Sequence, residues 1–147
     1  MENFVLSCCS TADLSLEHFQ NRNIHYICFH YELNGTVYPD DLGQSMPFDV
    51  FYEAMTKGAE TKTFQVNVAE FEAYFESFLK EGKDILHLCL SSGITGVMNS
   101  ANIAKDILAE KYHVSMPITQ SIYAVLFAGK NVEDAVLELM TRDNKAE

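Results

Sequence analysis

The stretch that decides the fold is Ile85-Leu86-His87-Leu88-Cys89-Leu90-Ser91-Ser92-Gly93, and it is followed by Val97, Ala101, Ala104 and Leu108 at helical spacing. The run from 85 to 90 is almost continuously apolar, which is typical of a strand buried on both faces of a parallel sheet. A glycine-containing turn then leads into the helix. Strand, turn and helix in this order form the βα unit of a parallel sheet, so the sequence predicts an α/β fold.

The residues before this unit predict a strand, a short helix and a hairpin. Phe4 to Leu6 is an apolar run that ends in small polar residues, and Ser15 is placed to cap a helix that reaches about Arg22. Residues 24–33 are rich in aromatic and β-branched types. Asn34-Gly35 then signals a tight turn into a return strand at 36–38. We therefore expect an antiparallel hairpin beside the first strand.

Further helices are expected before and after the buried strand along the chain. Ser45, with Pro47 in the first turn, is expected to cap a helix whose aromatic stripe packs into the core. Asn67 and Glu70 form a capping-box pattern before an apolar stripe that ends at Gly82. Two more helices are expected at 118–128 and 132–140. The apolar stripe of the helix that begins after Ser45 consists of Phe48, Phe51, Tyr52 and Met55, three of which are aromatic.

Length and charge exclude several classes of protein. The chain has 147 residues, enough for one domain with its own core. Ten basic and 21 acidic residues leave a net charge of 10 − 21 = −11, which disfavours binding to nucleic acids and to anionic membranes. No apolar run is long enough for a membrane span, and the first residues do not resemble a signal peptide. Four cysteines are too few for a disulfide framework, so we expect a cytoplasmic chain with free thiols.

Three polar clusters follow or flank the apolar elements. They are Ser10-Thr11-Ala12-Asp13, residues 61–65, and Ser91-Ser92-Gly93-Ile94-Thr95-Gly96. Ligands of open α/β sheets bind at the carboxyl ends of the strands. The first and third clusters are expected to lie there, because each follows a predicted strand. The third cluster combines hydroxyls, two glycines and the start of a helix, which is a favourable seat for an anion such as a carboxylate.

Catalytic and metal sites are less well supported by the residues. Ser91 or Ser92 could act as a nucleophile with one of the five histidines, but the sequence lacks the G-x-S-x-G and S-x-x-K patterns. His87 and Cys89 alternate on the buried strand, and Cys8-Cys9 has no second pair at metal-ligand spacing. We therefore expect packed thiols, a core histidine and no metal. The phosphate-binding and dinucleotide-binding fingerprints are absent.

Taken together, the clusters resemble the DegV family of bacterial fatty-acid-binding proteins over residues 4–110. The family's T-D-S-T-A-D-L is matched by Cys8-Cys9-Ser10-Thr11-Ala12-Asp13-Leu14, and its L-S-S-G-L-S-G-T by residues 90–97. The N/D-G hairpin, an aromatic helix at Val50-Phe51-Tyr52 and a T-S-Q-P-like turn at 63–66 lie between them in the family's order.

The resemblance implies a three-layer α/β/α domain with a mostly parallel sheet and no catalytic activity or cofactor. It implies a bound long-chain fatty acid, which family members deliver to a fatty-acid kinase. The carboxylate would be held by Thr63 and Ser92, and the acyl tail would enter an apolar tunnel. The remaining residues expected at the ligand are Ser10, Thr11, Phe64, Ser91 and Gly93.

The sequence departs from the family pattern at several positions. Cys8 and Cys9 replace Thr and Asp, Phe64 replaces Ser, and Val66 replaces Pro. The family's later D-S strand end and second domain have no counterpart, so we expect residues 1–147 to form one domain of the family's N-terminal type. The alternative hypotheses are a shortened domain with a structural role, paired as a homodimer or with another subunit through its exposed groove, and a small esterase.

Overall fold

The computed structural model describes residues 4–113, 121, 124–126 and 128–141. The chain divides into two compact units, Met1–Leu108 and Ala109–Glu147. The first unit carries both sheets and the candidate site. In the second unit, helix α6 spans Val132–Thr141, which confirms the helix expected at 132–140. The helix expected at 118–128 falls largely outside the described residues.

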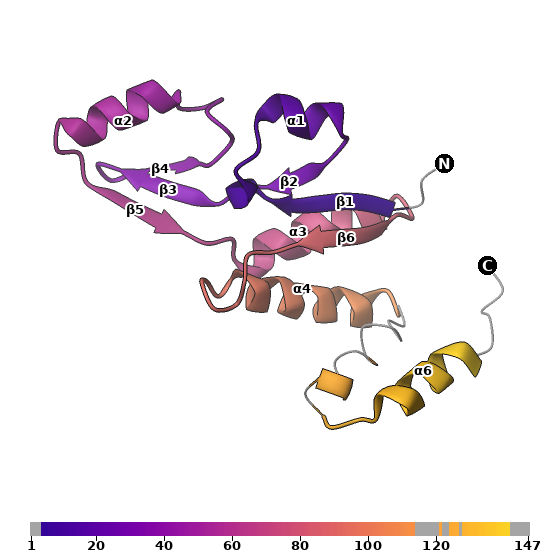
Figure 1. The fold of residues 1–147 in the computed structure, drawn as a ribbon. Coiled ribbons are helices and arrows are strands. Elements are labelled where there is room, and N and C mark those ends of the chain that lie inside the picture. The colour runs from indigo at the N-terminus through magenta and orange to yellow at the C-terminus, as the bar shows by residue number, and fades with distance from the viewer. Residues whose placement is uncertain (1–3, 114–120, 122–123, 127, 142–147) are drawn as a thin grey trace. The chain divides into compact units, whose positions relative to one another are not determined.

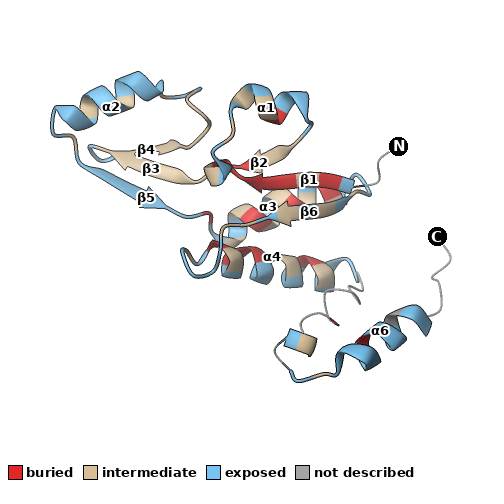
Figure 2. Ribbon diagram, viewed as in Figure 1, coloured by how far each residue is buried: buried red, intermediate tan, exposed pale blue. Residues whose placement is uncertain are grey.

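The first unit contains the expected parallel sheet, with strand order β2-β1-β6 (Figure 1). The strands are β1 (Phe4–Cys9), β2 (His25–Ile27) and β6 (Asp84–Leu88). In the register of the sheet, Ser7 lies between His25 and His87. Because β1 is central, it carries the most deeply buried strand residues, as Figure 2 shows.

A second, antiparallel sheet has the order β4-β3-β5. Its strands are β3 (His30–Leu33), β4 (Thr36–Pro39) and β5 (Thr61–Phe64). The Asn34-Gly35 turn is confirmed, but two expectations are wrong. The segment 24–33 is two strands in different sheets, and the hairpin pairs with β5 instead of lying beside the first strand. The polar cluster at 61–65, which alternation does not mark as a strand, supplies this third strand.

Helices cover both faces of the parallel sheet, which gives the expected three layers. Figure 1 shows α1 (Leu16–Asn21) on one side, with α3 (Val68–Leu79) and α4 (Val97–Lys111) on the other. The caps of α1 and α3 are confirmed: Ser15 accepts a hydrogen bond from the His18 N–H, and Asn67 forms a capping box with Glu70. The core against α3 and α4 contains Cys9, Ile27, Val66, Phe71, Phe75, Val97, Ala101, Ala104 and Leu108.

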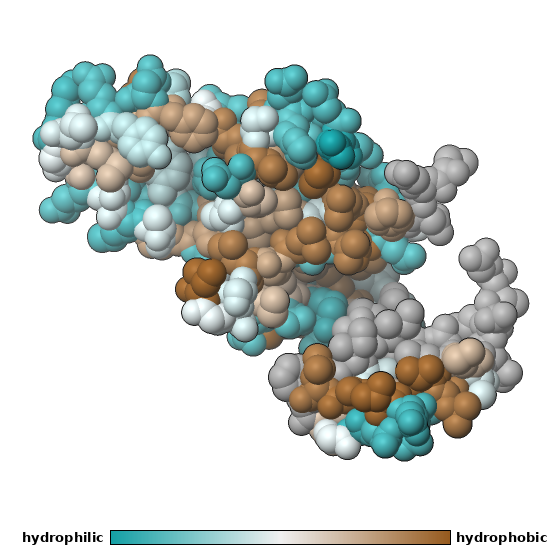
Figure 3. Space-filling model, viewed as in Figure 1, coloured by the Kyte–Doolittle hydropathy of each residue, from teal (hydrophilic) through white to brown (hydrophobic). Residues whose placement is uncertain are grey.

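Two predictions of burial are wrong. The strand β6 lies at an edge of the sheet, and Leu86 and Leu88 on one of its faces are 53% and 57% exposed. Figure 3 shows apolar side chains gathered on the surface over β1 and β6. The helix α2 (Phe48–Thr56) buries none of its residues, although its aromatic stripe was expected in the core. Its cap is Pro47, and Ser45 instead donates its hydroxyl to Asp41.

Within the described residues, every helix is too short or too polar to cross a bilayer. The four cysteines Cys8, Cys9, Cys28 and Cys89 are free thiols, as expected.

Candidate functional site

A cavity of about 650 Å³ lies within the first unit, between the antiparallel sheet, α2 and the turn that follows β6. Strand β3, the loop after β4, helix α2, the end of β5 and the turn 90–95 all contribute to it. Ligand-binding cavities in proteins fall in the range of about 300–1,000 Å³, so this one has room for a small organic molecule. It is lined by Thr11, Phe29, His30, Tyr31, Pro39, Asp40, Asp41, Gly43, Met46, Phe48, Phe51, Tyr52, Thr63, Phe64, Gln65, Leu90, Ile94 and Thr95.

Aromatic rings form most of the apolar wall. Tyr31 stacks on Tyr38 across the hairpin and meets Phe51 edge-on, with ring centroids 5.1 Å apart. Phe48 and Tyr52 from α2 remain 58% and 62% exposed. Rings left open to solvent around a cavity are more typical of a binding surface than of a completed core.

Polar residues of the cavity gather where the end of β5 meets the turn after β6. The Thr95 hydroxyl donates to Gln65 Oε1 at 2.8 Å. Gly96 allows this contact, since a Cβ at that position would lie 3.2 Å from the same oxygen. Thr63, Gln65 and Thr95 thus lie along one rim, which joins the end of β5 to the turn after β6. The clusters at 61–65 and 91–96 therefore meet at this cavity.

Thr11 contributes the most informative polar atom. Its Oγ1 is buried and has no hydrogen-bond partner among the described residues, although Thr11 lines the cavity. A buried hydroxyl without a partner costs about 1–3 kcal/mol, so such groups commonly complete their bonding with a ligand or water. The position of this hydroxyl favours a ligand with a polar end near Thr11.

Two carboxylates also line the cavity. Asp40 accepts a hydrogen bond from the Ser10 hydroxyl at 2.8 Å, and Asp41 accepts from the backbone N–H groups of Gln44 and Ser45. Burial raises the pKa of the neighbouring Tyr31, and the two carboxylates raise it further. Direct contact with either acid is therefore unfavourable for an anionic head group.

The structure places the seven predicted ligand residues at three places. Thr11, Thr63 and Phe64 line the cavity. Ser10 is buried just outside it, where its Oγ accepts from the Phe29 N–H and bonds Asp40. The other three, Ser91, Ser92 and Gly93, lie in the exposed turn between two lining residues, Leu90 and Ile94.

Sequence reasoning missed Gln65, Thr95 and the aromatic wall of α2. Gln65 and Thr95 belong to two of the polar clusters. Their polar character could be recognised in the sequence, but the hydrogen bond between them could not be predicted. The aromatic stripe of α2 has the same spacing as a core-facing stripe, and spacing alone does not distinguish a cavity wall from a core.

The hydroxyl of Ser91 bonds locally within its own turn. Ser91 Oγ accepts a hydrogen bond from the Gly93 N–H at 3.2 Å. Within the described residues, neither Ser91 nor Ser92 hydrogen-bonds to a histidine. The serine that does meet a histidine is Ser7, which is fully buried. The arrangement of this site suits binding of a polar group better than nucleophilic attack.

A family model and two curated relatives indicate the same family for this chain. The profile of the family described as "Uncharacterised protein, DegV family" matches residues 9–126. A DegV domain-containing protein of Clostridium perfringens is 34% identical over 112 residues, which are 76% of this chain and 38% of the relative. A similar protein of Streptococcus pyogenes is 31% identical over 109 residues, 74% of this chain and 38% of its own length.

Solved structures with low sequence identity share the fold. A stearic acid-binding protein from Eubacterium ventriosum aligns with a TM-score of 0.68 and 21% identity, over 93% of this chain and 52% of that one. The fatty acid-binding protein DegV from Bacillus subtilis aligns with a TM-score of 0.63 and 22% identity, over 95% of this chain and 53% of that one. The chain therefore spans about half the length of these structures and 38% of the curated relatives.

Proposed function

Because the chain belongs to the DegV family, we propose that it binds a long-chain fatty acid in the cavity between α2, the antiparallel sheet and the turn 90–95. The observation that carries the proposal is the combination of an aromatic wall with a hydroxyl rim in one cavity of about 650 Å³. Proteins of similar fold from Eubacterium ventriosum and Bacillus subtilis are described as binding fatty acids.

The apolar wall supplies the affinity for the acyl chain. Burying one methylene group contributes about 0.8 kcal/mol, so a chain of roughly 14 methylenes contributes on the order of 11 kcal/mol before the costs of association. The rings of Phe48, Phe51 and Tyr52 offer a surface that an acyl chain would cover. This contribution is large enough that the head group needs correct orientation more than strong attraction.

The hydroxyl rim supplies that orientation. We place the carboxylate near Thr11 and Thr63, because both threonines line the cavity and the Thr11 hydroxyl has no partner among the described residues. Ser92, with its neighbours Ser91 and Gly93, is assigned to the outer edge of this rim. Ser10 is assigned a supporting role, since its hydroxyl already joins Asp40 to Phe29.

The proposed role is that of a carrier in the cytoplasm, with no catalytic step and no cofactor. The carrier would present the bound acid to a kinase that forms the acyl phosphate. Free thiols and the acidic net charge of −11 support a cytoplasmic protein that does not bind nucleic acids. Pairing as a homodimer is a second candidate role, supported by the exposed apolar residues Leu86 and Leu88 on β6.

Lipid extraction followed by mass spectrometry tests the proposal. Protein purified from bacteria should carry a fatty acid, and added palmitate should raise the Tm of lipid-free protein. The double variant Thr63→Ala, Ser92→Ala should weaken palmitate binding without unfolding the chain, whereas Thr61→Ala, on the same strand but outside the cavity lining, should not.

Two results would distinguish fatty-acid binding from a role as a homodimer. Absence of bound acid together with no Tm shift on adding palmitate or oleate would reject fatty-acid binding. A molecular mass in light scattering that doubles with concentration, and stays doubled after lipid removal, would favour the homodimer.

A further inference from the structure

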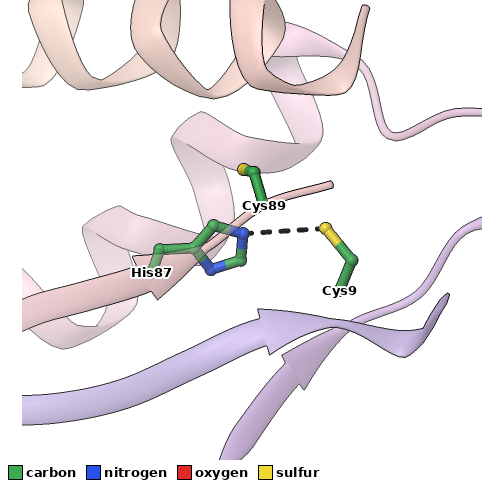
Figure 4. Close-up of side chains that lie close together, drawn as sticks. All are labelled: Cys9, His87 and Cys89. Carbon is green, nitrogen blue, oxygen red and sulfur yellow. Dashed lines mark hydrogen bonds between the residues drawn. The ribbon is translucent and has the colours of Figure 1, made fainter. Parts of the chain in front are cut away.

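A second cluster of reactive side chains lies at the carboxyl ends of the two longer strands of the parallel sheet. Cys9 ends β1, His87 lies on β6, and Cys89 follows β6 (Figure 4). The two Sγ atoms and one imidazole nitrogen all lie within 4.8 Å of one another. The expectation that these residues are only packed thiols and a core histidine does not account for three metal-ligating atoms meeting at one point.

The distances suit a small cation. Zinc binds sulfur at about 2.3 Å and nitrogen at about 2.0–2.1 Å, so tetrahedral ligation separates a sulfur from a nitrogen by about 3.6 Å. The distance between Cys9 Sγ and His87 Nε2 is 3.7 Å, as the dashed line in Figure 4 marks. Two thiolates and one imidazole are donors that thiophilic divalent cations prefer.

The histidine is already oriented as a ligand. Its Nδ1 lies 2.9 Å from Ser7 Oγ, and Ser7 Oγ lies 2.7 Å from Tyr74 Oη. When Nδ1 carries the proton and donates it to Ser7, the lone pair of Nε2 faces Cys9. Metal-binding histidines commonly have their second nitrogen held in this way. Phe71 and Phe75 meet the imidazole ring edge-on and fix its plane.

A smaller cavity of about 220 Å³ borders the two cysteines. It is lined by Cys9 and Cys89 together with Cys8, Thr11 and apolar residues such as Leu6 and Leu88, and His87 is not among its lining residues. The net charge of −11 raises the local concentration of cations around the chain.

We propose that Cys9, His87 and Cys89 bind a thiophilic divalent cation of the Zn²⁺ class, with water as the fourth ligand. Binding releases the two thiol protons to solvent and leaves the imidazole neutral. The inference is independent of fatty-acid binding, because none of these three residues lines the larger cavity.

Titration of the reduced 147-residue chain with Co²⁺ tests the site. Tetrahedral Co²⁺ bound by thiolates absorbs through a sulfur-to-metal charge-transfer band, and we expect this band to saturate at one equivalent with the intensity of two thiolates. Zn²⁺ should displace Co²⁺ and abolish the band. Cys9→Ser and Cys89→Ser should each lower the affinity for Co²⁺ at least tenfold. Ser7→Ala should lower it by roughly 10–100-fold through the loss of its bond to His87.

Cys8→Ser is the matched control, because Cys8 is equally buried and adjacent to Cys9 but lies outside the cluster. It should leave the Co²⁺ spectrum unchanged. Circular dichroism of each variant establishes that it is folded, and the wild-type spectrum tests the site even where a variant unfolds. The proposal is overturned if the wild-type chain gives no thiolate band, or if Cys8→Ser loses the band as Cys9→Ser does.

Discussion

Replacing Thr11 with Val separates ligand binding from folding, because the two effects have opposite signs. The hydroxyl of Thr11 is buried without a partner among the described residues, and Val has nearly the same shape. Removing an unsatisfied buried hydroxyl should stabilise the lipid-free fold by about 1–3 kcal/mol. For a chain of this size, that gain corresponds to an increase in Tm of roughly 3–10 °C.

The same change should weaken fatty-acid binding. A hydrogen bond from a hydroxyl to a carboxylate contributes about 1.5–3 kcal/mol, so its loss should raise the Kd for palmitate roughly 10- to 100-fold. Thermal unfolding by circular dichroism measures the first effect, and isothermal titration calorimetry with delipidated protein measures the second.

Thr61→Val is the control for this experiment. Thr61 is exposed on β5 and does not line the cavity, so its replacement should change stability by less than about 0.5 kcal/mol and leave the Kd unchanged. A Thr11→Val protein that is less stable than wild type, or that binds palmitate equally well, would refute the reasoning about the unpartnered hydroxyl.

Three further predictions follow from contacts of buried side chains. Ser10→Ala should lower the free energy of unfolding by about 2–4 kcal/mol, because it leaves Asp40 and the Phe29 N–H without their partner; urea unfolding measures the loss, and a change below 0.5 kcal/mol would contradict it. Phe71→Ala should cost about 3–5 kcal/mol in the same assay, since Phe71 is fully buried in the main core. Burial raises the pKa of Tyr74 to about 12, so the folded chain holds this proton above pH 10 while the unfolded chain releases it; stability should therefore fall between pH 10 and 12, and Tyr74→Phe should reduce that slope.

Local signals predicted the elements they define physically. The Asn67 and Glu70 capping box forms as expected, because both bonds lie within four consecutive residues. The Asn34-Gly35 turn forms for the same reason, with both residues at positive φ. The helix after the serine turn buries the four residues that its spacing indicated, so helical periodicity identified the face that meets the sheet.

Positions in the sheets depend on long-range pairing and could not be predicted in this way. An apolar run such as 85–90 suits either a central strand or an edge strand, and only the order β2-β1-β6 places Leu86 and Leu88 on an open face. The break between β2 and β3 is equally hidden, because residues on both sides of it favour strands.

The candidate site shows the same division between local and long-range information. The polar clusters were visible as residue types, and the meeting of the segments around 63 and 92 was expected only from the family resemblance, because residues 61–65 belong to the antiparallel sheet. The partner of Thr95 and the missing partner of Thr11 depend on contacts between segments far apart in the chain. The Cys9, His87 and Cys89 cluster was hidden for the same reason, since Cys9 at the end of β1 is far in sequence from His87 and Cys89 at the end of β6.

A crystal structure of the chain with bound palmitate tests the central claim most directly. We predict that the acyl chain lies against Phe48, Phe51 and Tyr52, with a carboxylate oxygen within hydrogen-bond distance of Thr11 Oγ1 or Thr63 Oγ1. A carboxylate that contacts neither threonine hydroxyl, or palmitate bound elsewhere with this cavity empty, would contradict the account.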